Sequence, residues 1–122
     1  MNTFFREEFL PLTGIDILQC PIDASAGFTV LSGGKMPVLF YRVEDIAHGL
    51  APGLSMFLGC PSMKLKNTNL ADDKAYADLY KKFRESFKLP HELCQTIYNS
   101  IPYVRSLYSE SEIAQFTARW SS

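Results

Sequence analysis

Two acidic residues, Glu44 and Asp45, come directly after a segment that is typical of a β-strand, Val38 to Val43. Carboxylates at the C-terminal end of a strand in a layered fold are well placed for general acid or base chemistry. The same pair could instead cap and charge the start of the helix that is expected to follow. We therefore treat the pair as a candidate strand-end site with two open interpretations.

A polar loop between residues 60 and 70 supplies the second set of candidate residues. The candidates for anion or cofactor binding are Lys64, Lys66, Asn67, Asn69 and Lys74. Ammonium groups, amides and the free N–H donors of a helix start can together hold phosphate or sulfate. A solvated surface loop, with the asparagines in turns or caps, has the same composition. Both interpretations remain open.

Other catalytic signatures are missing from the sequence. It contains no GxGxxG, GxxxxGK[ST], GxSxG or HExxH pattern, and its only histidines are His48 and His91. The cysteines, Cys20, Cys60 and Cys94, have no metal-ligand spacing, so we expect buried free thiols in a reducing compartment. The sequence alone predicts no catalytic residue and no metal site.

The first half of the chain is expected to be rich in strands. Ile15 to Cys20 alternates apolar and polar residues, and Gly27 to Leu31 and Val38 to Val43 are rich in β-branched and aromatic residues. Ser32 to Lys35 between the last two is a glycine turn, which predicts a β-hairpin. A helix should then end at Gly59.

The second half has a helical period. Tyr76, Leu79, Tyr80, Phe83 and Phe87 form one apolar stripe, which we expect to be core. A second helix begins near Pro90 and is interrupted by Pro102. Ser109 and Glu112 form a capping box that opens the last helix. Three strands followed by helices predict an α/β or α+β fold, with a small hairpin-bearing sheet and a helical C-terminal half.

The composition of the chain limits the classes of fold and function that are possible. The chain has 122 residues, 47% hydrophobic and 20% charged, so we expect a single domain over 1–122, strand-rich over 1–60 and helical over 61–122. A net charge of −1 disfavours nucleic-acid binding. The apolar stretches are too short or too interrupted for membrane insertion or a signal peptide, and we expect a cytoplasmic protein.

Several segments together resemble a known family. In order, they read FLPLTGIDI, VLFYRVEDI, MFLG, NTNLADDKAYADLY and LPHELCQTIYNSIPYVRSLYSESEIAQFTARW. This series resembles the C-terminal part of the sulfotransferase-like family of capsular polysaccharide synthesis proteins, and it covers nearly the whole chain. The resemblance implies the later half of a P-loop sulfotransferase fold, without its nucleotide-binding strand and loop.

The resemblance also implies a cofactor. Sulfotransferases carry a loop similar to RKGxxGDWK that holds the 3′-phosphate of 3′-phosphoadenosine 5′-phosphosulfate. Lys66, Asp72 and Lys74 match or nearly match that pattern, whereas Thr68 and Ala71 stand in place of its glycines and Asp73 in place of its tryptophan. The phosphosulfate loop and catalytic base lie in the N-terminal half of that family. We therefore expect no cofactor in isolation, and this donor only where a complete site is assembled.

Three functions follow as hypotheses. The chain is a truncated relative that serves as an accessory or protein-interaction module without catalysis of its own, or half of a sulfotransferase that acts on polysaccharide with a partner chain. The third is a small-anion or nucleotide-binding module. The first predicts a protein partner or a homo-oligomer, with Phe4, Phe5 and Phe40 as candidate interface residues.

Overall fold

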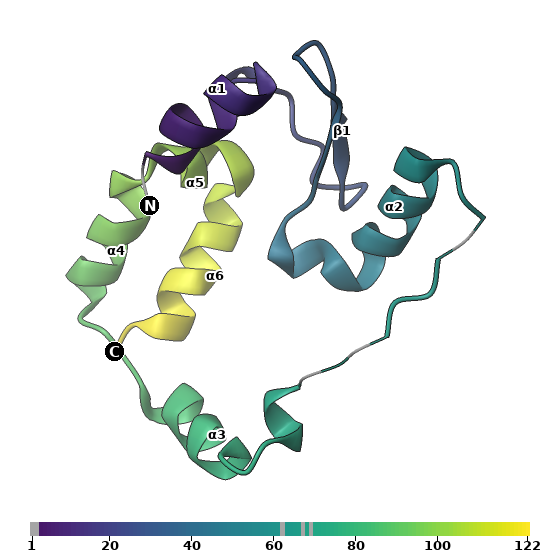
Figure 1. Cartoon of the computed structure of the whole chain (residues 1–122). Coiled ribbons are helices and arrows are strands. Elements are labelled where there is room, and N and C mark those ends of the chain that lie inside the picture. The colour runs from purple at the N-terminus through teal and green to yellow at the C-terminus, as the bar shows by residue number, and fades with distance from the viewer. Residues whose placement is uncertain (1–2, 62, 67, 69) are drawn as a thin grey trace.

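The computed structural model describes residues 3–61, 63–66, 68 and 70–122. These residues form a two-stranded antiparallel hairpin and six α-helices, a mostly helical α+β fold (Figure 1). The elements are α1 (Leu10–Thr13), β1 (Thr29–Leu31), β2 (Val38–Phe40), α2 (Ala51–Leu58), α3 (Ala77–Ser86), α4 (His91–Ser100), α5 (Pro102–Leu107) and α6 (Glu110–Trp120). Short 3₁₀ or π turns lie at Phe5–Phe9, Ile17–Gln19, Val43–Asp45, Ile46–Leu50 and Ala71–Asp73.

The hairpin confirms the prediction made from its turn. Val30 lies opposite Leu39, and Gly33 in the connecting turn has a φ of 97°, which a residue with a Cβ adopts only with strain. Both strands are shorter than their sequence patterns suggested. The chain leaves β2 at Tyr41 and enters the helical turns that lead to α2.

The predicted first strand, Ile15 to Cys20, is wrong. Residues Ile17–Gln19 form a 3₁₀ turn, because the Asp16 carboxylate accepts a hydrogen bond from the Leu18 backbone N–H at 3.0 Å. This local bond gives the backbone an alternative to a strand ladder. The alternation of apolar and polar residues still corresponds to burial, because Ile15 and Ile17 both lie in the core.

The core is small. Ile15, Ile17 and Leu31 are its buried centre, and half-buried rings and aliphatic side chains pack around them. That surrounding layer consists of Phe5, Phe9, Cys20, Ile22, Val38, Phe40 and Tyr103. Tyr103 comes from α5, so this core joins the N-terminal half of the chain to the C-terminal helices.

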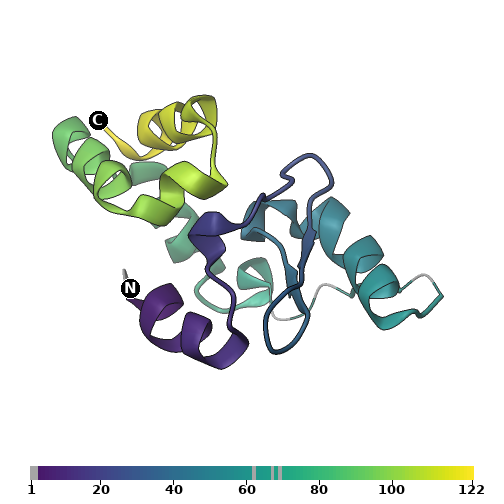
Figure 2. The ribbon, with the colours of Figure 1, turned by 90° about the horizontal axis from the view of Figure 1, so that it is seen from above.

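The helices α4, α5 and α6 lie together on one side of the molecule, and the hairpin and α2 lie on the other (Figure 2). The termini of these helices follow their predicted signals. Pro90 is the N-cap of α4, Pro102 opens α5, and the Ser109–Glu112 capping box is present at the start of α6. Gly59 ends α2 in a left-handed conformation, also as predicted.

Helix α3 stands apart from the rest of the fold, at the end of the long connection that follows α2 (Figure 1). The helix itself was predicted, but its apolar stripe is not core. Leu79 is 71% exposed and Phe83 52% exposed, and Tyr76, Tyr80 and Phe87 are exposed as well. Helical periodicity identifies the side chains that share a face, but it does not identify what covers that face.

The chain therefore has a larger accessible surface than a compact monomer of the same mass. Its accessible surface is 8886 Å², whereas a compact monomer of 13.8 kDa exposes about 6,600 Å². The excess, roughly 2,000 Å², is comparable to the total surface buried in a stable protein–protein interface.

Candidate functional site

Arg42 is the centre of a buried polar network. Its guanidinium forms a two-point ion pair with Asp45, from Nε to Oδ2 at 2.6 Å and from Nη2 to Oδ1 at 3.2 Å. Nη1 donates to the Glu112 carboxylate and to the Leu107 carbonyl oxygen, both at 3.0 Å. Arg42 is only 8% exposed and Asp45 6%, so water is largely excluded from the pair. We call this set of contacts the Arg42 clasp.

Local structure places each member of the clasp. Arg42 precedes the 3₁₀ turn Val43–Asp45, which brings Asp45 back beside it. The capping box fixes Glu112, because its Oε2 accepts the Ser109 backbone N–H at 2.8 Å and its other oxygen remains for Arg42. The clasp thus ties the end of β2 to the start of α6.

Tyr108 completes the clasp on its exposed side. The Arg42 guanidinium carbon lies 5.0 Å from the centre of the Tyr108 ring, a cation–π contact. The Tyr108 hydroxyl donates to Glu44 Oε2 at 3.0 Å. Glu44 therefore accepts a hydrogen bond from Tyr108, whose ring contacts Arg42, and is linked to the clasp in this way.

The charges of the clasp are reflected in its pKa values. The hydrogen bonds from Arg42 hold the pKa of Asp45 below its usual value of 3.8. The Ser109 backbone N–H, together with the Ser109 hydroxyl and Arg42, lowers the pKa of Glu112 from 4.5. Burial, aided by the bond to Glu44, raises the pKa of Tyr108 to about 12. Asp45 and Glu112 are thus ionised at neutral pH and Tyr108 keeps its proton.

Both members of the candidate strand-end pair make structural contacts, Asp45 with Arg42 and Glu44 with Tyr108. His48, 3.6 Å from Asp45 between Nε2 and Oδ1, is the nearest histidine to this pair and is exposed. His91 lies elsewhere, at the start of α4, with its Nδ1 3.2 Å from the Ser121 hydroxyl. This arrangement joins two distant segments of the chain, and no described residue near it forms a nucleophile–base pair.

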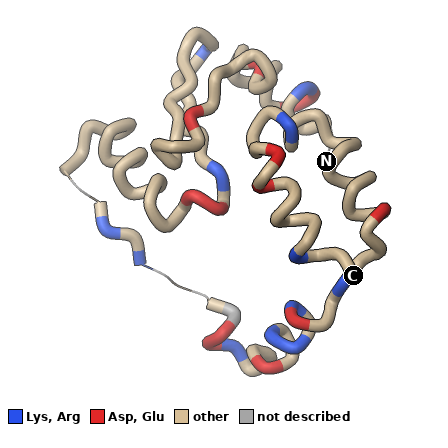
Figure 3. The backbone as a smooth tube through the Cα atoms, turned by 180° about the vertical axis from the view of Figure 1, so that it is seen from behind, with Lys and Arg blue, Asp and Glu red and all other residues tan. Residues whose placement is uncertain are grey.

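The lysine loop is only partly described. Lys64 and Lys66 are exposed, and Lys74 is half-buried just before α3. Asn67 and Asn69 lie outside the described residues. Figure 3 shows Lys and Arg along the connection and α3, with Asp and Glu among them. Anion binding by the full predicted set stays a prediction.

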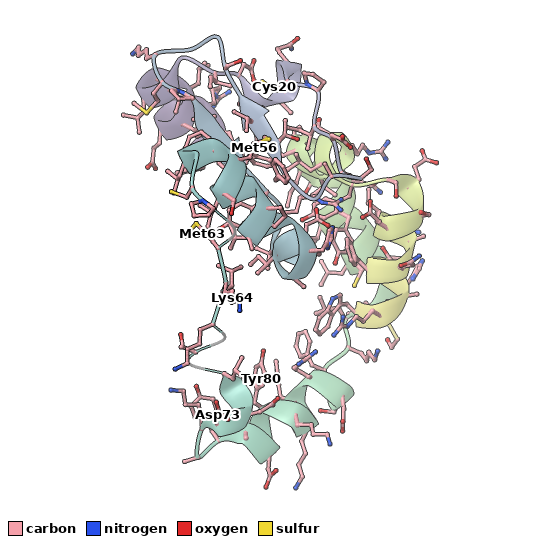
Figure 4. The ribbon with its side chains drawn as sticks, turned by 90° about the vertical axis from the view of Figure 1, so that its right-hand side faces the viewer. Cys20, Met56, Met63, Lys64, Asp73 and Tyr80 are labelled. Carbon is pink, nitrogen blue, oxygen red and sulfur yellow. The ribbon has the colours of Figure 1, made fainter. Side chains whose placement is uncertain are left out.

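The candidate interface residues lie in different environments. Phe4 is exposed, whereas Phe5 packs on Tyr103 with ring centres 4.6 Å apart. Phe40 is half-buried against the core. The larger exposed apolar surface is the α3 stripe, in which Tyr80 lies toward the rest of the molecule (Figure 4). The helical period predicts the stripe, but its predicted place in the core is wrong.

Two cavities flank α6. One, of about 780 Å³, lies among α4, α5 and α6, and the other, of about 680 Å³, lies between α6 and α3. Arg84 and Arg119 line the second cavity and were not singled out from the sequence. The Tyr80–Arg84 spacing of four residues on one helix face was the available signal.

Among the described residues, no group of three or more His, Cys, Asp or Glu is placed to hold a metal ion. No helix that these residues form is long and apolar enough to cross a membrane. All three cysteines are free, but only Cys94 is buried and Cys60 is exposed, so the expectation of buried thiols is wrong for Cys60.

Comparison with known proteins gives one match. The family model NKWYS, described as "Putative capsular polysaccharide synthesis protein", matches residues 1–109. No curated protein and no solved structure matches the chain.

Proposed function

Because the chain belongs to the NKWYS family of capsular polysaccharide synthesis proteins, we propose that it serves this process as an accessory module. In this role it docks on a partner protein and performs no catalysis of its own. The observation that carries the proposal is the uncovered apolar stripe of α3 on a chain with a large excess of accessible surface.

The clasp supports the non-catalytic part of the proposal. A general base needs a free lone pair within reach of a substrate proton. The Asp45 carboxylate is instead held at two points by Arg42, and Glu44 accepts from Tyr108. These acidic groups therefore stabilise the fold.

The stripe supports the docking part. Monomeric proteins seldom leave a continuous apolar face uncovered, and tyrosine and phenylalanine are enriched in protein interfaces. Leu79 lies at the edge of the stripe away from Arg84, on the assumption of about 100° per residue in a helix. We assign the docking contact to this edge.

A site-specific crosslinking experiment tests the assignment. A photoreactive amino acid replaces Leu79, and a matched control carries it at Leu12, which is 64% exposed on α1. In capsule-forming cells we expect a discrete protein adduct from position 79 and none from position 12. Absence of an adduct at position 79, or equal adducts at both positions, would argue against docking through α3.

A further inference from the structure

Helices α3 and α6 face each other across an aromatic groove of about 680 Å³, a size typical of ligand sites. Its lining residues are Tyr80, Phe83 and Arg84 from α3, Phe116, Arg119 and Trp120 from α6, and Tyr98, Val104, Tyr108 and Glu44. Six of these ten side chains are aromatic. Aromatic walls on opposite sides of an open groove suit a ligand with flat, weakly polar faces.

Two arginines stand at one end of the groove. Arg84 and Arg119 also line an adjoining cavity of about 470 Å³, together with Tyr80, Lys81, Asp72 and Glu85. Each guanidinium is oriented by a ring, Arg84 at 5.8 Å from the centre of Tyr80 and Arg119 at 5.2 Å from the centre of Trp120. A guanidinium that stacks on a ring still offers its N–H edge, which matches the two oxygens of a carboxylate.

Tyr98, Tyr108 and Glu44 line the groove but not the adjoining cavity that the two arginines share. Tyr108 is fixed there by its bond to Glu44 and by a perpendicular contact with Phe116, whose ring centre is 5.5 Å away. Burial raises the pKa of Tyr98, and Tyr108 also keeps its proton, so both phenols are neutral at physiological pH. The Tyr98 hydroxyl can donate, and the Tyr108 oxygen and the Glu44 carboxylate can accept, so these groups are suitable partners for sugar hydroxyls.

The charges of the lining limit the class of ligand. Lys81, Arg84 and Arg119 are balanced by Glu44, Asp72 and Glu85 over the two cavities. A balanced lining does not favour a polyanion such as a nucleotide, whose phosphates need several uncompensated donors. It accommodates one negative charge between the two arginines.

We propose that the groove binds an oligosaccharide that contains a uronic acid, with its carboxylate between Arg84 and Arg119 and its sugar rings on the aromatic walls. Tyr80 and Phe83 of the stripe line the groove, whereas Leu79 does not, so substitution of Leu79 tests docking on a partner separately from saccharide binding. The inference thus goes beyond the proposed accessory role and fails independently of it.

The single tryptophan of the chain provides a direct probe. Trp120 lines the groove, so ligand stacking should change its fluorescence. The titrants are cellobiouronic acid, which has one carboxylate, and cellobiose as the matched neutral sugar. We expect saturable binding of the acid with a Kd of about 1 mM and about fivefold weaker binding of cellobiose.

Variants locate the binding site. Arg84→Gln and Arg119→Gln should each weaken binding of the acid about fivefold, which brings it to the level of cellobiose. Arg105→Gln is the matched control, because Arg105 is exposed and lines the other cavity. It should bind like the unmodified chain. Urea unfolding of each variant separates a loss of binding from a loss of folding.

Three results would overturn the inference. The first is no change in Trp120 fluorescence with either sugar. The second is equal binding of the two sugars that persists in both arginine variants. The third is tighter binding of adenosine 3′,5′-bisphosphate than of the sugar acid, with the same dependence on Arg84 and Arg119, which would assign the groove to a nucleotide.

Discussion

The Arg42 guanidinium lies 3.0 Å from the Glu112 carboxylate, although the two residues are 70 positions apart in the chain. Each belongs to one of the segments that carry the family resemblance, VLFYRVEDI and YSESEIAQFTARW. In the structure these segments meet through the Arg42 clasp. The acidic strand-end motif thus contributes to the assembly of the fold.

Removal of Arg42 should destabilise the protein strongly. In Arg42→Gln, the Asp45 and Glu112 carboxylates lose their shared counter-charge, and we expect a loss of about 2–3 kcal/mol in the free energy of unfolding. Urea unfolding monitored by circular dichroism measures it. Arg105→Gln, which removes only an exposed bond to Asn99, should change it by less than about 0.5 kcal/mol. An unchanged midpoint in Arg42→Gln would show that the clasp contributes nothing.

Acid should weaken the clasp. The pKa values of Asp45 and Glu112 are lower in the folded protein than their ordinary values of 3.8 and 4.5, so the unfolded chain binds protons more tightly. Their stabilisation is present above about pH 5 and is lost as the pH falls through the folded-state pKa values. Urea midpoints measured from about pH 6 to pH 3 should fall less steeply in Glu112→Gln than in the unmodified chain. Parallel curves would contradict the depressed pKa of Glu112.

The capping box should stabilise α6 measurably. Ser109 accepts the Glu112 backbone N–H at 3.2 Å and donates its own backbone N–H to the Glu112 carboxylate. Ser109→Ala should cost about 1 kcal/mol, the usual value of an N-cap side chain. Ser86→Ala, at the end of α3, is a matched control with an expected change below about 0.5 kcal/mol. Equal losses of stability in the two variants would show that the Ser109 cap stabilises the protein no more than Ser86 does.

The exposed stripe and the core should respond oppositely to substitution. Leu79→Asp places a charge on a side chain that is 71% exposed and should change stability by less than about 0.5 kcal/mol. Ile17→Ala empties a site that is 2% exposed and should cost about 2–4 kcal/mol. Chemical denaturation compares them. A large loss in Leu79→Asp would mean that the stripe is covered within the free chain.

The sequence predicted those elements that local chemistry determines. The hairpin turn, Gly59, Pro102 and the capping box each specify a local backbone arrangement, and all are present. The predicted strand at Ile15 to Cys20 failed because the Asp16 side chain bonds its own backbone. Its alternation nevertheless agrees with the burial of Ile15 and Ile17 in the core.

Long-range relationships could not be predicted in this way. The contact between Arg42 and Glu112, and the presence of Arg84 and Arg119 in one groove, depend on how distant segments pack. Whether the α3 stripe is buried or exposed depends on whether another surface packs against it, and helical periodicity carries no information about that surface. The resemblance to sulfotransferases stays a prediction, and the family assignment rests on the match over residues 1–109.

Capsule complementation in cells tests the central claim most directly, namely that the chain docks on a partner and performs no catalysis. In cells that lack the gene, the account predicts that a chain with both His48→Ala and His91→Ala restores capsule to the level of the unmodified chain. Leu79→Asp, expressed and folded to the same extent, should lose most of that activity, whereas Leu12→Asp should retain it. Loss of capsule with the double histidine variant, together with full activity of Leu79→Asp, would contradict the account.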